Sequence, residues 1–174
     1  VNRTGFYLGR FLGGARVCAL IFFCVVIGYY AASASPFVQK SLFGPDHFYY
    51  FIYSFVTMII PNILIFGSLF FAVGAYTKKM SAVYVSGIVS FMFYLIAGTL
   101  SSNIDSKTLQ ALIDPFGIRA LRVLTQYWGV AEKNHNLVPM TGVLLWNRLI
   151  WGSIGTVFLT LAIYFAQRPV RTKS

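Results

Sequence analysis

Four long stretches of the sequence contain no Asp, Glu, Lys or Arg, and each is dominated by Leu, Ile, Val, Phe, Tyr, Ala and Gly. They cover residues 17–39, 47–77, 80–103 and 149–167. A helix needs about 20 apolar residues to cross a hydrocarbon layer of ~30 Å. The pattern therefore predicts an all-α integral membrane protein, folded as a single membrane domain over residues 1–174. We expect its four transmembrane helices at about 17–34, 48–76, 81–100 and 149–167.

The composition supports this class and bears on the partners of the chain. Apolar residues make up 57% of the sequence and charged residues 10%, against roughly 25% charged residues in soluble domains. The net charge of +10 is compatible with nucleic-acid binding, but the basic residues lie between the apolar stretches rather than along one soluble face. We therefore expect the lipid bilayer as a partner, and no nucleic acid.

The distribution of basic residues predicts the orientation in the membrane. Short segments rich in Lys and Arg mark the cytoplasmic side. If the N-terminus is cytoplasmic, residues 1–16, 77–80 and 168–174 are cytoplasmic as well. These segments hold eight of the 14 basic residues: Arg3, Arg10, Arg16, Lys78, Lys79, Arg168, Arg171 and Lys173. The longer outer segments hold the other six: Lys40, Lys107, Arg119, Arg122, Lys133 and Arg148. The prediction is a multi-pass protein with both ends inside, whose second and third spans form an antiparallel hairpin.

Pro61 and Asn62 lie in the middle of the second span. Pro61 cannot donate to the carbonyl of Thr57 and predicts a kink. Asn62 has two interpretations: its amide is satisfied by neighbouring helices, or it lines a translocation path. The glycine-rich residues 1–16 are interpreted as a flexible or interfacial segment before the first span.

The segment at 107–128 predicts a short amphipathic helix outside the membrane core. Asp114 suits the N-cap and Pro115 the first helical position. Ile118, Leu121, Leu124 and Trp128 then share one face, while Arg119, Arg122 and Gln126 share the other. Such a helix is too polar to span, and we expect it in the outer interface. A shorter helix at 107–113 can precede it, and residues 143–146 either start the last span early or re-enter the membrane.

The sequence contains no recognisable catalytic constellation. His47 and His135 are isolated, no H-E-x-x-H or phosphate-binding G-x-x-x-x-G-K-[ST] motif occurs, and Cys18 and Cys24 are six residues apart on one predicted helix, which excludes a disulfide between them. We therefore predict no enzymatic activity, no catalytic, cofactor-binding or metal-ligating residues and no cofactor.

Three strings resemble ABC-2 type transporter permeases. Residues 1–13 (VNRTGFYLGRFLG) are similar to the run that leads into the third helix of such permeases, and residues 80–98 (MSAVYVSGIVSFMFYLIAG) to their fifth helix. Residues 112–148 (LIDPFGIRALRVLTQYWGVAEKNHNLVPMTGVLLWNR) match best, to the pattern DPFG..A....T.YWT..EkN...vPltG.lL.NR of large bacterial ABC-2-like membrane proteins. Some of those proteins are fused to an M1-family aminopeptidase domain. Gly129 replaces a frequent Thr of that pattern.

The resemblance implies a fragment that covers helices three to six of a six-helix permease unit in the bacterial inner membrane. Residue 1 is Val rather than Met, which also leads us to expect a longer chain. The implied function is ATP-driven export, with a separate ATP-binding cassette ATPase on the cytoplasmic side and a second permease unit as partners. Two alternatives stay open: an anchor for an M1-type aminopeptidase domain, or a structural membrane subunit without transport.

Overall fold

The computed structural model describes residues 3–33, 35–36, 48–101 and 104–167, and in this part of the chain it is helical, with no strand. Four helical rods, at Arg3–Ala32, Phe48–Thr77, Met80–Leu100 and Gly142–Gln167, are long and apolar enough to cross a membrane. The prediction of an all-α chain with four such helices is confirmed. Several residues used in the sequence analysis lie outside the described residues: Lys40, His47, Arg168, Arg171 and Lys173.

The first rod is α1 (Arg3–Ser33), which begins well before the expected start of the first span. Of the two alternatives for residues 1–16, a flexible segment is wrong from Arg3 onward, while an interfacial position stays a prediction. Tertiary contacts explain the difference, because the Tyr7 hydroxyl donates to the Ala166 carbonyl at 2.9 Å. Phe11 is buried and packs against Phe71. These contacts stabilise a helix that its glycines disfavour.

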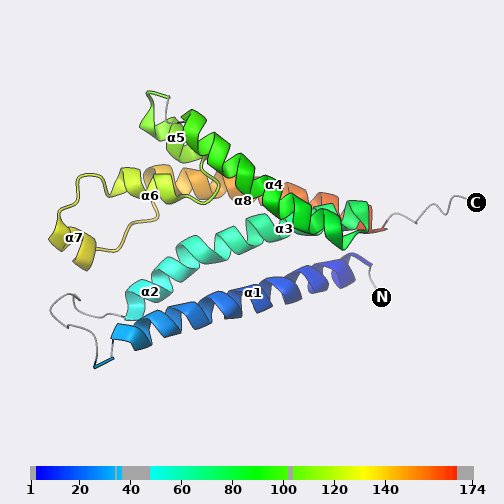
Figure 1. Ribbon diagram of the computed structural model, residues 1–174, viewed down its shortest axis with the longest axis horizontal. Helices are drawn as coiled ribbons and strands as arrows, with labels where there is room; N and C mark the ends of the chain where they lie inside the picture. The colour runs from blue at the N-terminus through cyan, green and yellow to red at the C-terminus, as the bar shows by residue number, and fades with distance from the viewer. Residues whose placement is uncertain (1–2, 34, 37–47, 102–103, 168–174) are drawn as a thin grey trace, which may run out of the picture.

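The second rod consists of α2 (Phe48–Ser54), the π-helical turn η2 (Phe55–Ile59) and α3 (Ile60–Thr77). The amide of Ile60 donates to the carbonyl of Phe55, five residues earlier, which widens the helix next to Pro61. The wider turn accommodates a residue that cannot donate a helical hydrogen bond. Figure 1 shows the rod bending in this region, as Pro61 predicted.

The second and third rods form the predicted antiparallel hairpin. Lys78 adopts a left-handed conformation (φ 57°), and its amide donates to the Gly74 carbonyl at 2.9 Å, which ends α3. After two residues α4 (Met80–Ser101) returns along α3. Figure 1 places this turn at the same end of the molecule as Arg3 and the end of α8.

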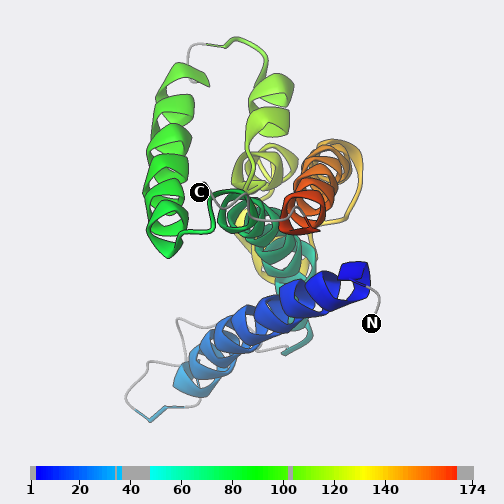
Figure 2. The same ribbon diagram turned by 90° about the vertical axis from the view of Figure 1, so that its right-hand side faces the viewer.

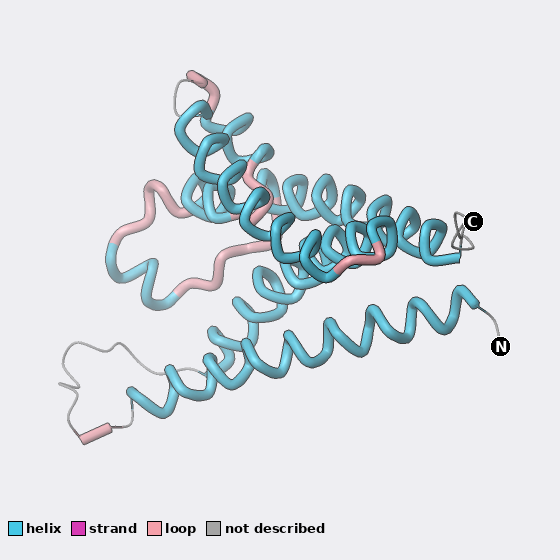
Figure 3. The backbone as a smooth tube through the Cα atoms, turned by 45° about the vertical axis from the view of Figure 1, so that its right-hand side comes forward, coloured by secondary structure: helices cyan, strands magenta, loops and turns pink. Residues whose placement is uncertain are grey.

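Short helices occupy the opposite end: α5 (Lys107–Ile113), α6 (Ile118–Leu124) and α7 (Val130–His135). The fourth rod, α8 (Gly142–Gln167), begins there and passes back through the molecule, with α3 as its main neighbour. It starts at Gly142, so residues 143–146 begin the last helix early, which was one of the two alternatives. A small apolar core of Ala111, Ala120 and Leu144 joins α5, α6 and α8. Figure 3 shows the loops that connect the short helices at the end away from the two marked termini.

The helix predicted from Asp114 to Trp128 is too long: within this range the structure has α6, which covers only Ile118–Leu124. The shorter helix predicted at 107–113 is confirmed as α5. Asp114 is the C-cap of α5, while Gly117 is the N-cap of α6. Figures 1 and 2 show α6 running alongside the first part of α8 rather than across the bundle.

The predicted faces of this helix also need correction. Ala120 is fully buried and forms the inward face with Val123 and Leu124, whereas Ile118 is 47% exposed. Trp128 lies beyond the end of α6. Packing against α8 selects the small side chain of Ala120 for the closest approach, and a periodic apolar pattern alone does not contain that information. Arg122 is exposed, as predicted.

Candidate functional site

The turn between α5 and α6, Asp114 to Gly117, is the centre of a buried polar cluster. Asp114 is 4% exposed, and its carboxylate accepts hydrogen bonds from the amides of Phe116 (3.0 Å) and Arg119 (2.7 Å). The amide of Arg119 is one of the free donors in the first turn of α6. Asp114 does not occupy the N-cap position of α6, which is Gly117. Its carboxylate nevertheless satisfies a free donor of this helix and so stabilises α6.

Asn147, which is fully buried in α8, closes the other side of the turn. Its amide nitrogen Nδ2 donates to the carbonyls of Ala111 (2.8 Å) and Asp114 (2.7 Å). Trp151, one helical turn further along α8, donates through Nε1 to the Leu112 carbonyl at 3.0 Å. The last carbonyls of a helix have no partner within the helix, so two side chains of α8 satisfy the end of α5.

Arg148 joins this turn to the second rod. The side chain is only 7% exposed. Its Nη1 donates to Asn62 Oδ1 at 2.9 Å, and its Nη2 donates to the Phe116 carbonyl. Asn62 Nδ2 donates to the same carbonyl at 3.2 Å. Asn62, Phe116 and Arg148 therefore form a closed triangle between α3, the α5–α6 turn and α8.

Glycine at position 117 makes room for this triangle. Gly117 has φ +73°, and a Cβ atom built there would overlap the Arg148 guanidinium. Both the left-handed backbone and the close approach of a charged side chain favour glycine. We name the set Asn62, Asp114 to Gly117, Asn147 and Arg148 the polar junction.

Two buried polar atoms of the polar junction have no hydrogen-bond partner among the residues that the structure describes: Asn147 Oδ1 and Arg148 Nε. A buried donor or acceptor without a partner costs about 1–3 kcal/mol, and more in a charged group. Such atoms are uncommon in native structures and call for an explanation. The junction is thus held by several hydrogen bonds while one of its charged members is incompletely satisfied.

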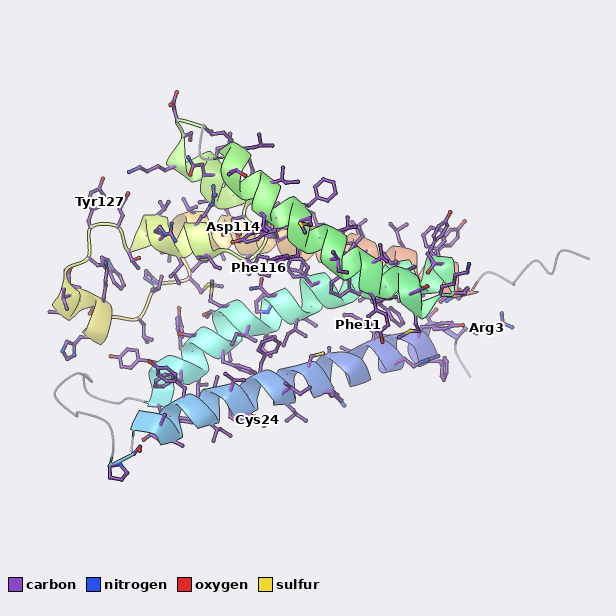
Figure 4. The ribbon with its side chains drawn as sticks, viewed as in Figure 1. Arg3, Phe11, Cys24, Asp114, Phe116 and Tyr127 are labelled. Atoms are coloured by element: carbon purple, nitrogen blue, oxygen red, sulfur yellow. The ribbon has the colours of Figure 1, made fainter. Side chains whose placement is uncertain are left out.

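Phe116 anchors the turn between two spans. Its ring stacks on Phe66 of α3 at a centroid distance of 4.7 Å and meets Tyr94 of α4 edge-on at 4.7 Å. Figure 4 shows Asp114 and Phe116 where α3, α4 and α8 meet the hairpin formed by α5 and α6, away from α1 and far from Arg3 at the end of the molecule. The α5–α6 hairpin therefore reaches between the long helices instead of lying on top of them.

The sequence placed Arg119 on the polar face of the helix, opposite the apolar face. In the structure its side chain bonds to α4. Its Nη2 donates to the Gly98 carbonyl at 2.7 Å. A small open recess lies beside this bond, between α4 and the hairpin. It is lined by Tyr94, Ala97, Gly98, Gln110, Ile113, Asp114, Pro115 and Arg119.

The structure resolves part of the question about Asn62. Both ends of its amide are bonded to neighbouring elements, as the packing interpretation predicted; the translocation path stays a hypothesis. Cys18 and Cys24 are free, in agreement with the excluded disulfide. Within the described ranges, no group of three or more His, Cys, Asp or Glu side chains is placed to hold a metal ion.

The polar junction was not predicted as a site. Arg148 was expected in an outer segment unless the last span began early, and the structure has the early start: Asn147 and Arg148 both lie within α8 and are buried. The available signal was that Asp114 and Arg148 are oppositely charged residues near predicted helix ends. The partners of Arg148, however, are 32 and 86 residues away along the chain, and no local pattern relates such positions.

Comparisons of this chain with protein-family models, with curated proteins and with solved structures found no significant match.

Proposed function

We propose that the chain is the membrane-spanning permease part of an ABC-type transporter, in which a separate ATPase subunit drives export. The proposal rests on residues 112–148, a string that resembles ABC-2 permeases most specifically. Its first residues, Asp114 to Gly117, and its last, Asn147 and Arg148, bond to one another. The string thus corresponds to one packed structural unit, as expected for a pattern that specifies a fold.

The proposed topology places the N-terminus and the end of α8 in the cytoplasm, with α5 to α7 on the outer side. It is supported by Figure 1, in which the start of α1, the turn between α3 and α4 and the end of α8 lie at one end of the molecule and the short helices at the other. The first of these ends carries basic residues, because Arg3 starts α1 and Lys78 and Lys79 form the turn. Helix α6 keeps its proposed position near the outer interface. Its direction along α8 replaces the flat orientation that the amphipathic pattern favoured.

The first four turns of α1 are the proposed contact with the ATPase. Arg3, Arg10 and Arg16 are exposed there, and Arg10 lies over the Phe6 ring at 5.8 Å from its centroid. Exposed basic and aromatic side chains together are typical of protein interfaces. A second permease unit, and a location in the bacterial inner membrane, belong to the same proposal.

Purification of the full-length protein from its native membranes in mild detergent tests the proposal. We expect an ATP-binding cassette ATPase to co-purify and to hydrolyse ATP in the reconstituted complex. Arg10→Glu should lower the recovered ATPase and its activity, because it reverses the charge at the proposed contact. Arg122→Glu, an equal charge reversal at the opposite end, is the matched control and should change neither.

Two outcomes would contradict the permease proposal. Recovery of aminopeptidase activity without any ATPase would favour the anchor for an M1-type domain. Recovery of neither activity would favour a structural subunit. Equal loss of ATPase in both charge-reversal variants would place the ATPase contact elsewhere.

A further inference from the structure

Helix α8 and the α5–α6 hairpin are joined as one body. Asn147 donates to two carbonyls at the end of α5, and Trp151 donates to a third. Ala111 and Ala120 of the hairpin pack against Leu144 of α8, and all three are at least 99% buried. Hydrogen bonds and apolar packing thus act together here, and we expect this joint to persist during any rearrangement.

The inner part of α3 is also fixed to α8. A Cβ atom at Gly155 would lie only 3.2 Å from the Cα of Ile65 and 3.4 Å from Ser68 Oγ. Backbones that approach so closely pack efficiently in membranes, and Ile65 and Ser68 are buried there. From Ile65 onward, α3 therefore belongs to the same body as α8 and the hairpin.

The start of α3 is held differently, by polar contacts at Asn62. Asn62 Oδ1 accepts from Arg148 Nη1, and Asn62 Nδ2 donates to the Phe116 carbonyl. Arg148 Nε has no partner in this arrangement. Arginine has five donors, and the described bonds of Arg148 go to an amide oxygen and a carbonyl, not to a carboxylate. Its hydrogen bonding is therefore incomplete. A second arrangement of its side chain is less unfavourable than it would be for a fully paired group.

A bend in the helix lies directly before this contact. Pro61 precedes Asn62, and η2 (Phe55–Ile59) precedes both. Prolines and π-turns interrupt the regular hydrogen bonding of a helix and are frequent at hinges and functional sites. On the far side of η2, α2 is bound by tyrosine hydroxyls to the end of α7 and to the segment after it, Tyr50 to the His135 carbonyl and Tyr53 to the Val138 carbonyl. Its aromatic side chains also contact Tyr29 and Tyr30 of α1.

We propose that Arg148 and Asn62 form a latch that fixes the start of α3 directly after the bend. When the latch opens, the start of α3 is released, and α2 turns about η2 and Pro61 relative to α8 and the α5–α6 hairpin. When the latch opens or closes, the outer part of the second rod, α2, changes its direction. The inner part, α3 from Ile65 onward, keeps one position. Its function is to couple the direction of α2 to the hydrogen bonds of one buried arginine. The device goes beyond the proposed function, because it is a property of the fold that does not depend on ATP or on a substrate.

Distances between spin labels test the latch in the full-length protein, reconstituted in lipid nanodiscs, with Cys18 and Cys24 replaced by Ser. Labels at the exposed positions Tyr49→Cys and Arg122→Cys report on α2 relative to the hairpin. Labels at Tyr76→Cys and Tyr164→Cys, exposed near the other end of α3 and α8, report on the inner body.

Asn62→Ala and Arg148→Lys each weaken the hydrogen bond between Arg148 and Asn62, one from each partner, and so favour opening of the latch. A hydrogen bond to a charged group shifts an equilibrium about ten- to a hundredfold. We expect both variants to raise the population of a second 49–122 distance about tenfold or more, and to leave the 76–164 distance unchanged. Thr160→Ala is the matched control, since Thr160 bonds only to its own helix at Thr156, and it should change neither distance.

The proposal is overturned if folded Asn62→Ala gives the same 49–122 distribution as the unmodified protein. It is also overturned if both label pairs change together, because Asn62 and Arg148 would then hold the whole bundle instead of the outer part of one rod. If Arg148→Lys fails to fold, Asn62→Ala decides by the same two criteria.

Discussion

Substitution of Gly117 by Ala tests whether the Arg148 guanidinium needs the space that this glycine provides. The added Cβ would overlap that guanidinium, which is the end of a long side chain. The overlap is therefore relieved when the guanidinium moves, and its hydrogen bonds to Asn62 and to the Phe116 carbonyl break. The expected cost is mainly that of the broken bonds.

The magnitude follows from two contributions. A left-handed conformation costs an L-residue about 1–2 kcal/mol, of which about 0.4–1 kcal/mol is offset because alanine restricts the unfolded chain. The two hydrogen bonds of the charged Arg148 contribute about 1.5–3 kcal/mol each. We expect Gly117→Ala to lower the free energy of unfolding by about 4–7 kcal/mol.

Gly142→Ala is the matched control. Gly142 also has a positive φ, +56°, but a Cβ there would meet only Leu124 Cδ2 at 4.0 Å. It should therefore cost only the backbone contribution of about 1 kcal/mol. The free energy of unfolding is measured by SDS titration of the full chain in detergent micelles, followed by tryptophan fluorescence.

A double substitution provides a second test in the same assay. In an Arg148→Ala background the guanidinium is already gone, so adding Gly117→Ala should cost only about 1 kcal/mol more. Equal destabilisation by Gly117→Ala and Gly142→Ala would refute the argument. Full additivity of Gly117→Ala and Arg148→Ala would refute it as well.

Three further predictions concern the helix contacts and the topology. Asn147→Ala should lower the free energy of unfolding by about 2–4 kcal/mol in the same titration, because it removes the side-chain donor of the buried Ala111 carbonyl and one of the two donors of the Asp114 carbonyl; a loss below 1 kcal/mol would contradict this. Gly155→Ala should destabilise by about 1–3 kcal/mol through overpacking against α3, whereas Gly152→Ala, with open space at its Cβ, should be neutral or stabilising. In a background without native cysteines, a membrane-impermeant thiol reagent should label Lys133→Cys in intact cells and Lys79→Cys only after permeabilisation; the reverse pattern would exclude cytoplasmic ends.

The apolar stretches were sufficient to predict the class of this protein and the existence of its four long helices. Uncharged runs of about 20 residues have few alternatives to a membrane-spanning helix, since the backbone must satisfy its own hydrogen bonds in lipid. The same local reasoning predicted the bend at Pro61 and the tight hairpin at Lys78. Each of these features depends on a residue and its neighbours within about one helical turn.

The helix at 107–113 was predicted as well, but the extent of α1 and the start and end of α6 were beyond such reasoning. Asp114 has the residue type of an N-cap, yet the structure uses its backbone to end α5 and its carboxylate to cap α6. That outcome depends on Asn147, which occupies the carbonyls at the end of α5 and so makes a break between two helices favourable. A propensity at one position cannot include a partner 33 residues away.

The sequence by itself determined which segments are long and apolar enough to cross a membrane. Hydropathy is a sum over residues and requires no knowledge of neighbours in space. Only the tertiary structure decided that Arg148 is buried and what it binds. A guanidinium is tolerated in the interior when acceptors converge on it, and its acceptors come from α3 and from the α5–α6 turn. Their convergence is a property of how the helices pack, so the polar junction exists only in the folded molecule.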